Sequence, residues 1–255
     1  MNGFSEPRQL LDDIGLSLVF FTRLRLPSSD FGGRSLADSI WAAPFAGFAV
    51  AIIGALVYAI AVALGLAAGP AAALALAATM LATGGLHEDG LSDIADGFGG
   101  GRTRENKLEI MRDSRIGAYG AAALGVSLLI RWSTLSELAG PGHVFLALLA
   151  AHAASRGLFG AFMHLVPPAR MDGLSATAGL VSAETATAGA ALGAVALLAL
   201  GLGGAIPALI LLSLLFAAFR ALCLSQIGGQ TGDTIGALQQ LAEIAVLLTA
   251  SVCLS

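Results

Sequence analysis

Long apolar runs alternate with short polar segments along most of the 255-residue chain. A helix needs about 20 apolar residues to cross a bilayer, with a range of roughly 17–25. Because transmembrane β-strands would need short segments of alternating polarity, these continuous runs predict membrane-spanning helices. Seven candidate spans lie at about 40–64, 71–87, 118–138, 144–166, 186–202, 205–224 and 238–254, of which the second, fifth and seventh are short.

The opening segment, residues 10–26, has a different pattern. Two aspartates and two arginines interrupt its leucine, isoleucine, valine and phenylalanine residues too often for a span. This mixture predicts an amphipathic helix at the membrane interface, and it lacks the order of regions typical of a signal peptide. The sequence therefore predicts an all-α fold, a polytopic transmembrane helix bundle of about six to seven spans plus an N-terminal interfacial helix. Residues 1–255 are expected to form a single integral membrane domain.

The composition supports a membrane protein, with 56% hydrophobic and only 12% charged residues. A soluble domain carries about 25% charged residues, so this chain has too few to cover a water-exposed surface. This excludes a disordered chain, a disulfide scaffold and a soluble enzyme. The net charge of −4 argues against nucleic acid as a partner, and the two cysteines give no metal or redox signal.

Charged residues gather on one side of the predicted topology. Of the 13 lysines and arginines, four precede the first span, five lie between the second and third spans, and Arg170 lies between the fourth and fifth. The loops on the other side, 65–70, 139–143 and 201–204, contain no Lys, Arg, Asp or Glu. The positive-inside rule then places the N-terminus and the charged loops in the cytoplasm. We expect a multi-pass protein of the cytoplasmic (inner) membrane whose active site faces the cytoplasm.

The most informative segment, residues 83–101, carries three aspartates in helical register. Asp89, Asp93 and Asp96 stand at i, i+4 and i+7, which places them on one helix face. Like charges at the end of an apolar helix repel one another unless a cation neutralises them, and oxygen ligands suit Mg²⁺ or Mn²⁺. The alternative is a solvated acidic loop in which the spacing arises by chance.

Glycines and one histidine accompany these aspartates. Gly84 and Gly85 let the helix break, or let the backbone approach a large ligand. His87 is either a metal ligand or, as is more common for a lone histidine at a helix end, a hydrogen-bonding residue.

Two further cytoplasmic segments carry groups that suit phosphate. In residues 109–117, Arg112 and Arg115 flank Asp113 and Ser114, which places guanidinium groups beside another oxygen ligand. The alternative is that these arginines only fix the topology. Residues 228–236 form a glycine-rich loop of the kind whose N–H groups hold phosphates, but it has no Gly-Lys-Ser/Thr and is equally explained as a plain turn.

Ionisable residues inside the predicted spans are functional candidates by default. Arg156 lies four residues after His152 in the fourth span, and Glu243 lies in the seventh. A structural ion pair between Arg156 and Glu243 is the alternative. Arg131 and Glu137 are expected near the far face, where a long side chain can reach the interface.

Taken together, these segments resemble the cobalamin synthase family, the adenosylcobinamide-GDP ribazoletransferases. Its blocks occur in family order across nearly the whole chain. Glu88 departs from the family pattern, in which leucine is common, and its role is left open. The resemblance rests on residues 84–97, 110–117, 155–156 and 228–236, followed by Glu243, and residues 21–27 are also similar.

The resemblance implies an integral membrane enzyme that performs the last assembly step of adenosylcobalamin. A hydroxyl of α-ribazole, or of its 5′-phosphate, would displace GMP from adenosylcobinamide-GDP, with Mg²⁺ required. Such a phosphoryl transfer depends on charge neutralisation and positioning more than on covalent chemistry. The oligomeric state is left open, with a homo-oligomer as one option.

The resemblance and the residue pattern together assign roles. One or two Mg²⁺ would hold the pyrophosphate, the arginines would stabilise the leaving GMP, and Asp96 would accept the proton of the attacking hydroxyl. The expected metal ligands are Asp89, Asp93 and Asp96, with Asp113 or Asp233, and the expected catalytic residues are Asp93, Asp96, Arg112 and Arg115. The expected substrate- and phosphate-binding residues are Gly84, Gly85, His87, Ser114, Arg156, Gly229, Gln230, Thr231, Gly232 and Thr234.

Two other functions fit parts of the pattern. A CDP-alcohol phosphotransferase also places aspartates on membrane helices around metal, but here Phe98 and three glycines follow Asp96-Gly97 where that motif has Ala-Arg. An ion or small-solute transporter should place its polar groups near mid-membrane on repeated, broken helices. The acids of this chain gather at one face instead, and no internal repeat is clear.

Overall fold

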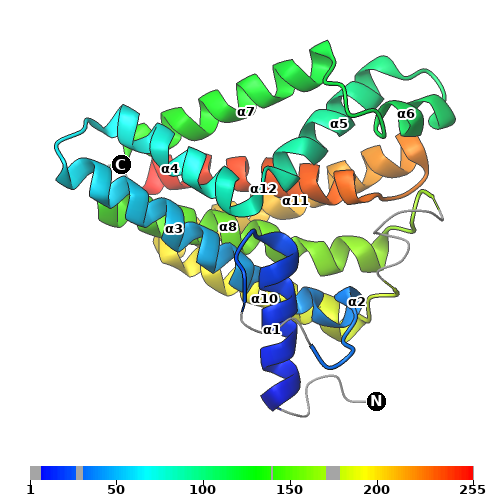
Figure 1. Ribbon diagram of the computed structural model, residues 1–255, viewed down its shortest axis with the longest axis horizontal. Coiled ribbons are helices and arrows are strands. Elements are labelled where there is room, and N and C mark those ends of the chain that lie inside the picture. The colour runs from blue at the N-terminus through cyan, green and yellow to red at the C-terminus, as the bar shows by residue number, and fades with distance from the viewer. Residues whose placement is uncertain (1–6, 27–30, 139, 171–178, 255) are drawn as a thin grey trace.

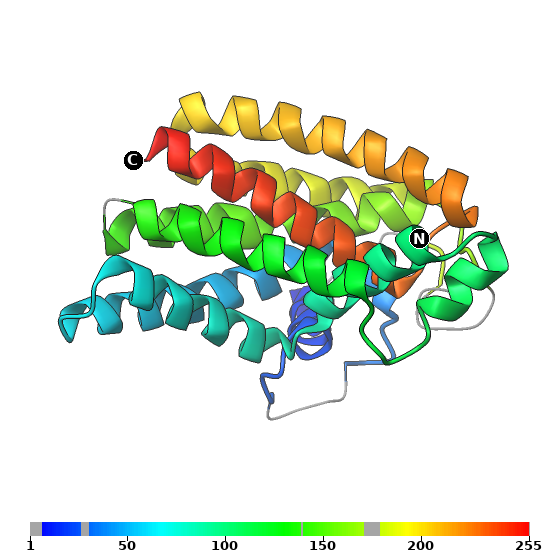
Figure 2. The same cartoon turned by 90° about the horizontal axis from the view of Figure 1, so that it is seen from above.

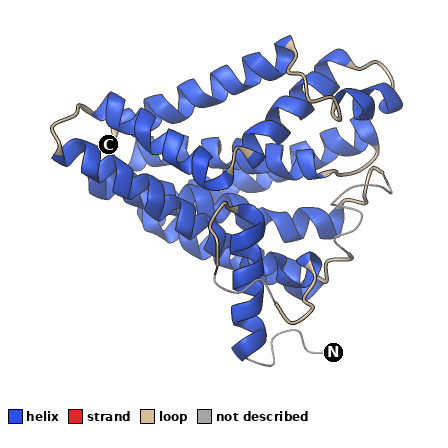
Figure 3. Cartoon of the chain, in the orientation of Figure 1, coloured by secondary structure: helices blue, strands red, loops and turns tan. Residues whose placement is uncertain are grey.

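The computed structural model describes residues 7–26, 31–138, 140–170 and 179–254. Within these ranges every extended element is a helix (Figure 3), and the β-structure consists of an isolated bridge between Pro168 and Gln230. This confirms the predicted all-α fold. The elements are α1 (Pro7–Phe21), α2 (Leu36–Ser39), η1 (Ile40–Ala42), α3 (Ala43–Ala63), α4 (Ala68–Thr83), α5 (Leu86–Gly100), α6 (Arg104–Ile110), α7 (Ala118–Glu137), α8 (Pro141–Leu165), α10 (Ala183–Ala196), η2 (Leu197–Leu200), α11 (Gly201–Ile227) and α12 (Gly232–Cys253).

Each predicted span coincides with a helix, but the count of seven spans is not confirmed. Four stretches of the described residues are long and apolar enough to cross a membrane, and α4 with α5 would make a fifth if this bent pair forms one span. Helix α7 is not among them. The four stretches are Leu36–Ala63, Pro141–Leu165, Ala183–Ile227 and Gly232–Cys253.

The 45-residue stretch Ala183–Ile227 is too long to be one straight span. As a straight helix it would be about 68 Å long, more than twice the thickness of a bilayer core. Gly201 breaks it with a φ of 69°, and Gly193 of α10 lines the same groove as Leu212 of α11. The two arms therefore lie close together, as the separate predicted spans 186–202 and 205–224 require.

The long helices run along one axis and separate the two kinds of loop (Figures 1 and 2). The turn between α3 and α4 and the C-terminal end of α12 lie at one end, while α6 and the turn between α11 and α12 lie at the other. Helix α1 runs across this axis in Figure 1 and is seen nearly end-on in Figure 2, which is the orientation expected of an interfacial helix.

A buried ion pair fixes α1 against the segment that precedes α3, through Arg34 before α2 and Trp41 in η1. The Asp13 carboxylate is fully buried and accepts hydrogen bonds from Arg34 (Nε to Oδ1, 2.6 Å) and from the Trp41 indole (Nε1 to Oδ2, 2.8 Å). A buried carboxylate needs such partners because losing hydration is costly. The aspartate that interrupts the apolar pattern of the N-terminal segment is therefore what attaches that helix.

Small residues allow the bundle helices to pack closely around α8. A Cβ on Gly47 of α3 would lie 2.3 Å from the carbonyl oxygen of His152, and one on Gly157 of α8 would lie 2.9 Å from Cα of Gly193. Close backbone approach through small residues is the usual mode of helix packing in membranes, where apolar side chains gain nothing by leaving lipid. The abundance of glycine and alanine therefore serves packing.

A polar network occupies the centre of the bundle, and it corrects the prediction for Arg131. Its side chain is 1% exposed rather than reaching the far face, because Nη1 donates to two buried carboxylates. These are Glu88 Oε1 at 3.1 Å and Glu243 Oε1 at 3.2 Å. The network thus joins α5, α7 and α12.

The predicted pair of Arg156 and Glu243 is also corrected. The other oxygen of Glu243 accepts from Gln239 Nε2 at 2.6 Å and lies 3.1 Å from His152 Nδ1. Arg156 instead donates from Nη1 to the main-chain oxygen of His152 at 3.0 Å. Glu243 therefore takes its positive partner from α7, and Arg156 stays bonded within its own helix.

Candidate active site

Two consecutive glycines set the direction of the helix that carries the aspartates. Gly84 and Gly85 both have left-handed backbone conformations, with φ of 70° and 73°, and α4 and α5 meet there at a bend of 90°. Side chains disfavour such conformations. The predicted helix break is confirmed, and the predicted span 71–87 ends at Thr83.

The carboxylates of two helices face each other where α5 crosses the start of α12. Asp89 and Asp93 lie on α5, and Asp233 lies in the first turn of α12. A Cβ on Gly90 would lie only 2.7 Å from the main-chain oxygen of Asp233. Asp93 is half-buried and lies within electrostatic range of Asp89, Asp233 and Asp96. The absence of a side chain at residue 90 thus lets the carboxylates meet.

Replacing Gly90 by Ala should therefore displace the two helices. Overpacking of this kind costs about 1–3 kcal/mol, so we expect a lower melting temperature in detergent. The matched control is Gly125→Ala on α7, where an added Cβ meets nothing within 4 Å. Equal melting temperatures for the two variants would contradict the close contact.

Asp96 has a structural role that its spacing did not reveal. Its Oδ2 accepts from the N–H of Gly117 at 2.7 Å and its Oδ1 from the N–H of Gly120 at 2.9 Å. These are unpaired N–H groups at the start of α7, where a carboxylate is favourable. Asp96 therefore fixes the loop before α7 to α5, and its predicted roles as metal ligand and proton acceptor stay predictions.

The predicted phosphate-binding residues after α6 lie in that loop. Arg115 is exposed and binds Asp113 through Nε (3.0 Å) and Nη2 (2.5 Å). Hydrogen bonds from Arg115 lower the pKa of Asp113 to about 2. Ser114 and Arg112 are also exposed. The loop therefore presents two guanidinium groups to solvent, and that of Arg115 binds Asp113 of the same loop.

The glycine-rich loop between α11 and α12 is held by a neighbouring segment. The N–H of Gln230 donates to the oxygen of Pro167, and the oxygen of Gln230 accepts from the N–H of Ala169, both at 2.8 Å. A Cβ on Gly229 would lie 2.3 Å from the oxygen of Pro167. Part of this loop is thus a packed turn, which accounts for Gly229 without a ligand.

The end of the loop forms the start of α12. Thr231 is the N-cap, and its hydroxyl and that of Thr234 close a reciprocal capping box. The Thr231 hydroxyl also donates to Asp233 Oδ2 at 3.1 Å, and Arg170 Nη2 lies 3.8 Å from the same oxygen. Helix N-termini attract anions through their free N–H groups. Gly232 and Asp233 place this N-terminus beside the carboxylates of α5.

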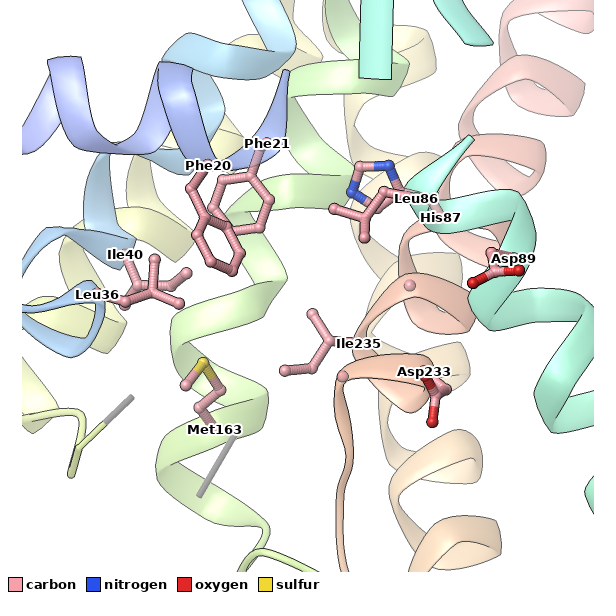
Figure 4. A pocket seen from close by; sticks show the side chains of 12 residues that line it. Phe20, Phe21, Leu36, Ile40, Leu86, His87, Asp89, Met163, Asp233 and Ile235 are labelled. Carbon is pink, nitrogen blue, oxygen red and sulfur yellow. The ribbon is translucent and has the colours of Figure 1, made fainter. Parts of the chain in front are cut away.

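A cavity of about 130 Å³ opens next to these carboxylates (Figure 4). Asp89 and Asp233 lie at one part of its lining, and His87 lies nearby on α5. Gly232, next to Asp233 in the chain, also lines the cavity. The rest of the lining comes from apolar side chains of α1, α2, η1, α5, α8 and α12, which are Phe20, Phe21, Leu36, Ile40, Leu86, Met163 and Ile235.

The carboxylates suit a divalent cation that is shared with a substrate. Among the described residues, no three His, Cys, Asp or Glu side chains form a ready metal site. Mg²⁺, however, is usually bound through one or two carboxylates plus substrate phosphate oxygens. Asp89 and Asp233, which both line the cavity and lie within electrostatic range of each other, suit that mode.

Several interior residues were not predicted, the role of Glu88 was left open, and one predicted residue lies elsewhere. Glu88 is buried and accepts from Gln240 as well as Arg131, so it faces the polar network. Arg156 is also in the interior and does not line the cavity. The adjacent amides Gln239 and Gln240 at the start of an apolar run were the signal for this network.

The bundle thus gathers carboxylates, a helix N-terminus and exposed guanidinium groups at one end, beside an apolar cavity. These are the features of an integral membrane enzyme that acts on phosphorylated substrates.

Comparison with known proteins gives the family. The chain belongs to the cobalamin-5-phosphate synthase family, whose model matches residues 13–251. It is 73% identical over 250 residues to a protein of Mesorhizobium japonicum named adenosylcobinamide-GDP ribazoletransferase, covering 98% of this chain and 96% of the relative. Proteins with the same name from Bradyrhizobium diazoefficiens (52% identity; 98% and 96% covered) and Azorhizobium caulinodans (44%; 94% and 95%) are also similar. No solved structure matches the chain.

Proposed function

We propose that this chain is an adenosylcobinamide-GDP ribazoletransferase. It joins adenosylcobinamide-GDP to α-ribazole, or to α-ribazole 5′-phosphate, and releases GMP. The carrying observation is that carboxylates of α5 and α12 meet at an anion-attracting helix N-terminus, in a chain 73% identical to a relative with this name.

The reaction transfers one phosphoryl group. A hydroxyl oxygen of the acceptor forms a bond to the phosphorus that carries the cobinamide, and the bond from that phosphorus to the GMP oxygen breaks. The hydroxyl gives up its proton, and GMP leaves with the bonding electron pair. Catalysis of such a step rests on in-line positioning and neutralisation of phosphate charge.

Asp89 and Asp233 are the proposed holders of Mg²⁺, together with pyrophosphate oxygens. Both carboxylates line the cavity and come from different helices, which suits an ion shared with the substrate. The bound ion supplies charge stabilisation to the pyrophosphate. The free N–H groups at the start of α12 add to that stabilisation.

Asp93 is the proposed proton acceptor. It lies next to the other two carboxylates, is half-buried, and makes no hydrogen bond within the described part of the chain. Both oxygens of Asp96, by contrast, already accept main-chain hydrogen bonds. Asp96 then acts by holding the loop of Arg112 and Arg115, which we propose to stabilise the leaving GMP.

The charged end of the bundle is proposed to face the cytoplasm across the inner membrane. The loops at the opposite end lack Lys and Arg, so the positive-inside rule gives this orientation. Both nucleotide substrates are then on the side where the carboxylates lie.

The test is turnover by the purified protein in detergent. Adenosylcobinamide-GDP, α-ribazole and Mg²⁺ should give GMP and adenosylcobalamin, and a chelator should stop the reaction until Mg²⁺ is restored. A CDP-alcohol in place of the GDP donor should give no product. Transfer from the CDP-alcohol, or the absence of any GMP release, would contradict the proposal.

The metal assignment has its own variant. Asp89→Asn should raise the Mg²⁺ concentration for half-maximal rate about tenfold, because an amide binds this ion more weakly than a carboxylate. Glu109→Gln, at an exposed position on α6, is the control and should keep the wild-type Mg²⁺ dependence. If both variants show the same Mg²⁺ dependence, Asp89 is not a ligand of the ion.

A further inference from the structure

The cavity beside the carboxylates has two chemically different parts (Figure 4). Asp89 and Asp233 lie at one part, whereas Phe20, Leu36 and Ile40 lie at another, with no charged group among them. About 10–15 Å³ of such space holds one water molecule, so the 130 Å³ here has room for a ring system. A ligand that fills this cavity must therefore contain both an apolar group and a polar group.

We propose that this cavity binds the dimethylbenzimidazole base of the acceptor nucleoside. This assignment rests on the proposed function and deepens it by locating one substrate. The base is a flat, apolar, two-ring group attached to a sugar, so it combines the two properties that the lining selects.

The apolar lining favours this base over the other groups of the two substrates. Leu36, Ile40 and Ile235 have no hydrogen-bonding group, and Met163 has only a weak acceptor. The guanine of the donor carries several donors and acceptors, and those placed against these apolar side chains would lose water without gaining a partner. The corrin ring is far larger than the cavity. The dimethylbenzimidazole base loses little hydration and gains apolar contact.

Aromatic rings of the chain offer the base a stacking surface. Phe21 and His87 both line the cavity, with ring centroids 6.4 Å apart and planes inclined by 21°. His87 also stacks on Phe159 at 5.9 Å, and Phe159 in turn contacts Phe21 at 5.1 Å, so the three rings form one cluster. The edge of Phe20 meets Phe21 at 4.9 Å. A flat base in the cavity would pack against the side of this aromatic cluster that lines it, where Phe20 is half-buried.

The position of the carboxylates gives the base an orientation. Because Asp89 and Asp233 line the same cavity, a base in its apolar part directs the attached sugar toward them. The sugar hydroxyl then lies on the side of the proposed Mg²⁺ site and of Asp93. Burial of the base therefore positions the nucleophile, which is how remote binding contributes to rate.

The experiment narrows the cavity without touching the carboxylates. Leu36→Trp should raise the KM for α-ribazole about tenfold, which is the scale of steric discrimination in apolar pockets. The KM for adenosylcobinamide-GDP should stay unchanged. The control is Leu11→Trp, at an exposed position of α1, which should change neither constant. A nucleoside carrying benzimidazole without methyl groups should lose less in Leu36→Trp, because it needs less space.

A direct binding measurement tests the cavity assignment independently of the proposed reaction. Calorimetry of α-ribazole with the wild-type protein, Leu36→Trp and Met163→Trp, in the absence of donor, should show weaker binding to both variants. If wild-type protein makes no cobalamin but these variants still weaken α-ribazole binding, the proposed reaction fails and the cavity assignment stands. Met163→Trp narrows the cavity from α8, so the result does not depend on one variant folding.

Three results would overturn the assignment. They are an unchanged KM and affinity for α-ribazole in both variants, an increased KM for the GDP donor instead, and loss of a co-purifying lipid from the variants with no change in α-ribazole binding. The last result would identify the cavity as a site for a lipid chain.

Discussion

Asp93→Asn is expected to lower kcat by about 10³-fold, within the range for removing a general base. An amide has almost the size of the carboxylate but cannot take the proton of the attacking hydroxyl. If Asp93 acts as the base, the Mg²⁺ dependence of the remaining activity should stay that of the wild type. Measurement of GMP release against Mg²⁺ concentration gives both values.

The controls for this variant separate chemistry from folding. Asp93→Asn should melt at or above the wild-type temperature, because it removes a charge from a group of like charges that lie close together. Glu109→Gln on α6 should keep full activity. If Asp93→Asn keeps an activity close to that of the wild type, Asp93 is not the proton acceptor. A large rise in its Mg²⁺ requirement would make it an ion ligand instead.

Arg131→Met is expected to destabilise the protein by about 3–5 kcal/mol, the cost of leaving buried carboxylates without their positive partner. Arg131 is 1% exposed and donates to Glu88 and Glu243, both in the interior. For a chain of this length, such a loss lowers the melting temperature by about 10 °C or more. Thermal unfolding in detergent measures it. Arg102→Met, at an exposed position, is the matched control and should melt like the wild type.

A second substitution tests whether charge balance is the cause. Glu88→Leu together with Arg131→Met removes one charge of each sign, and Glu243 keeps its contact with His152. The double variant should therefore be less destabilised than the sum of the two single variants. If the two effects simply add, Arg131 contributes through packing rather than through its ion pairs.

The helices could be predicted from the sequence because each needs only its own apolar run. The directions in which they run could not. Gly84 and Gly85 indicate a break, but the bend of 90° depends on what α5 meets on its far side. Arg131 shows the same limit, because a long cationic side chain in an apolar run fits either the interface or the interior. Only the positions of Glu88 and Glu243 decide between them.

The candidate site was predictable where its residues share one helix. Asp89 and Asp93 follow the helical period and lie within electrostatic range of Asp233, while their binding of a metal stays a prediction. The partners of Asp96 were not predictable, since Gly117 lies 21 residues away. Its main-chain N–H group is one that almost every residue has, so the sequence does not single it out. The apolar lining of the cavity was equally hidden, because its leucine and isoleucine side chains are of the same types as those that face lipid.

The contact of Gly90 with the first turn of α12 bears on how this enzyme family can diverge. Where two helices touch through main-chain atoms, their spacing does not depend on the size of any side chain. Substitutions among the leucines, valines and alanines of the outer surface then leave the distance between the two acidic helices unchanged. The outer surface can therefore change to suit lipids of different length or composition, while the spacing of the two acidic helices stays the same.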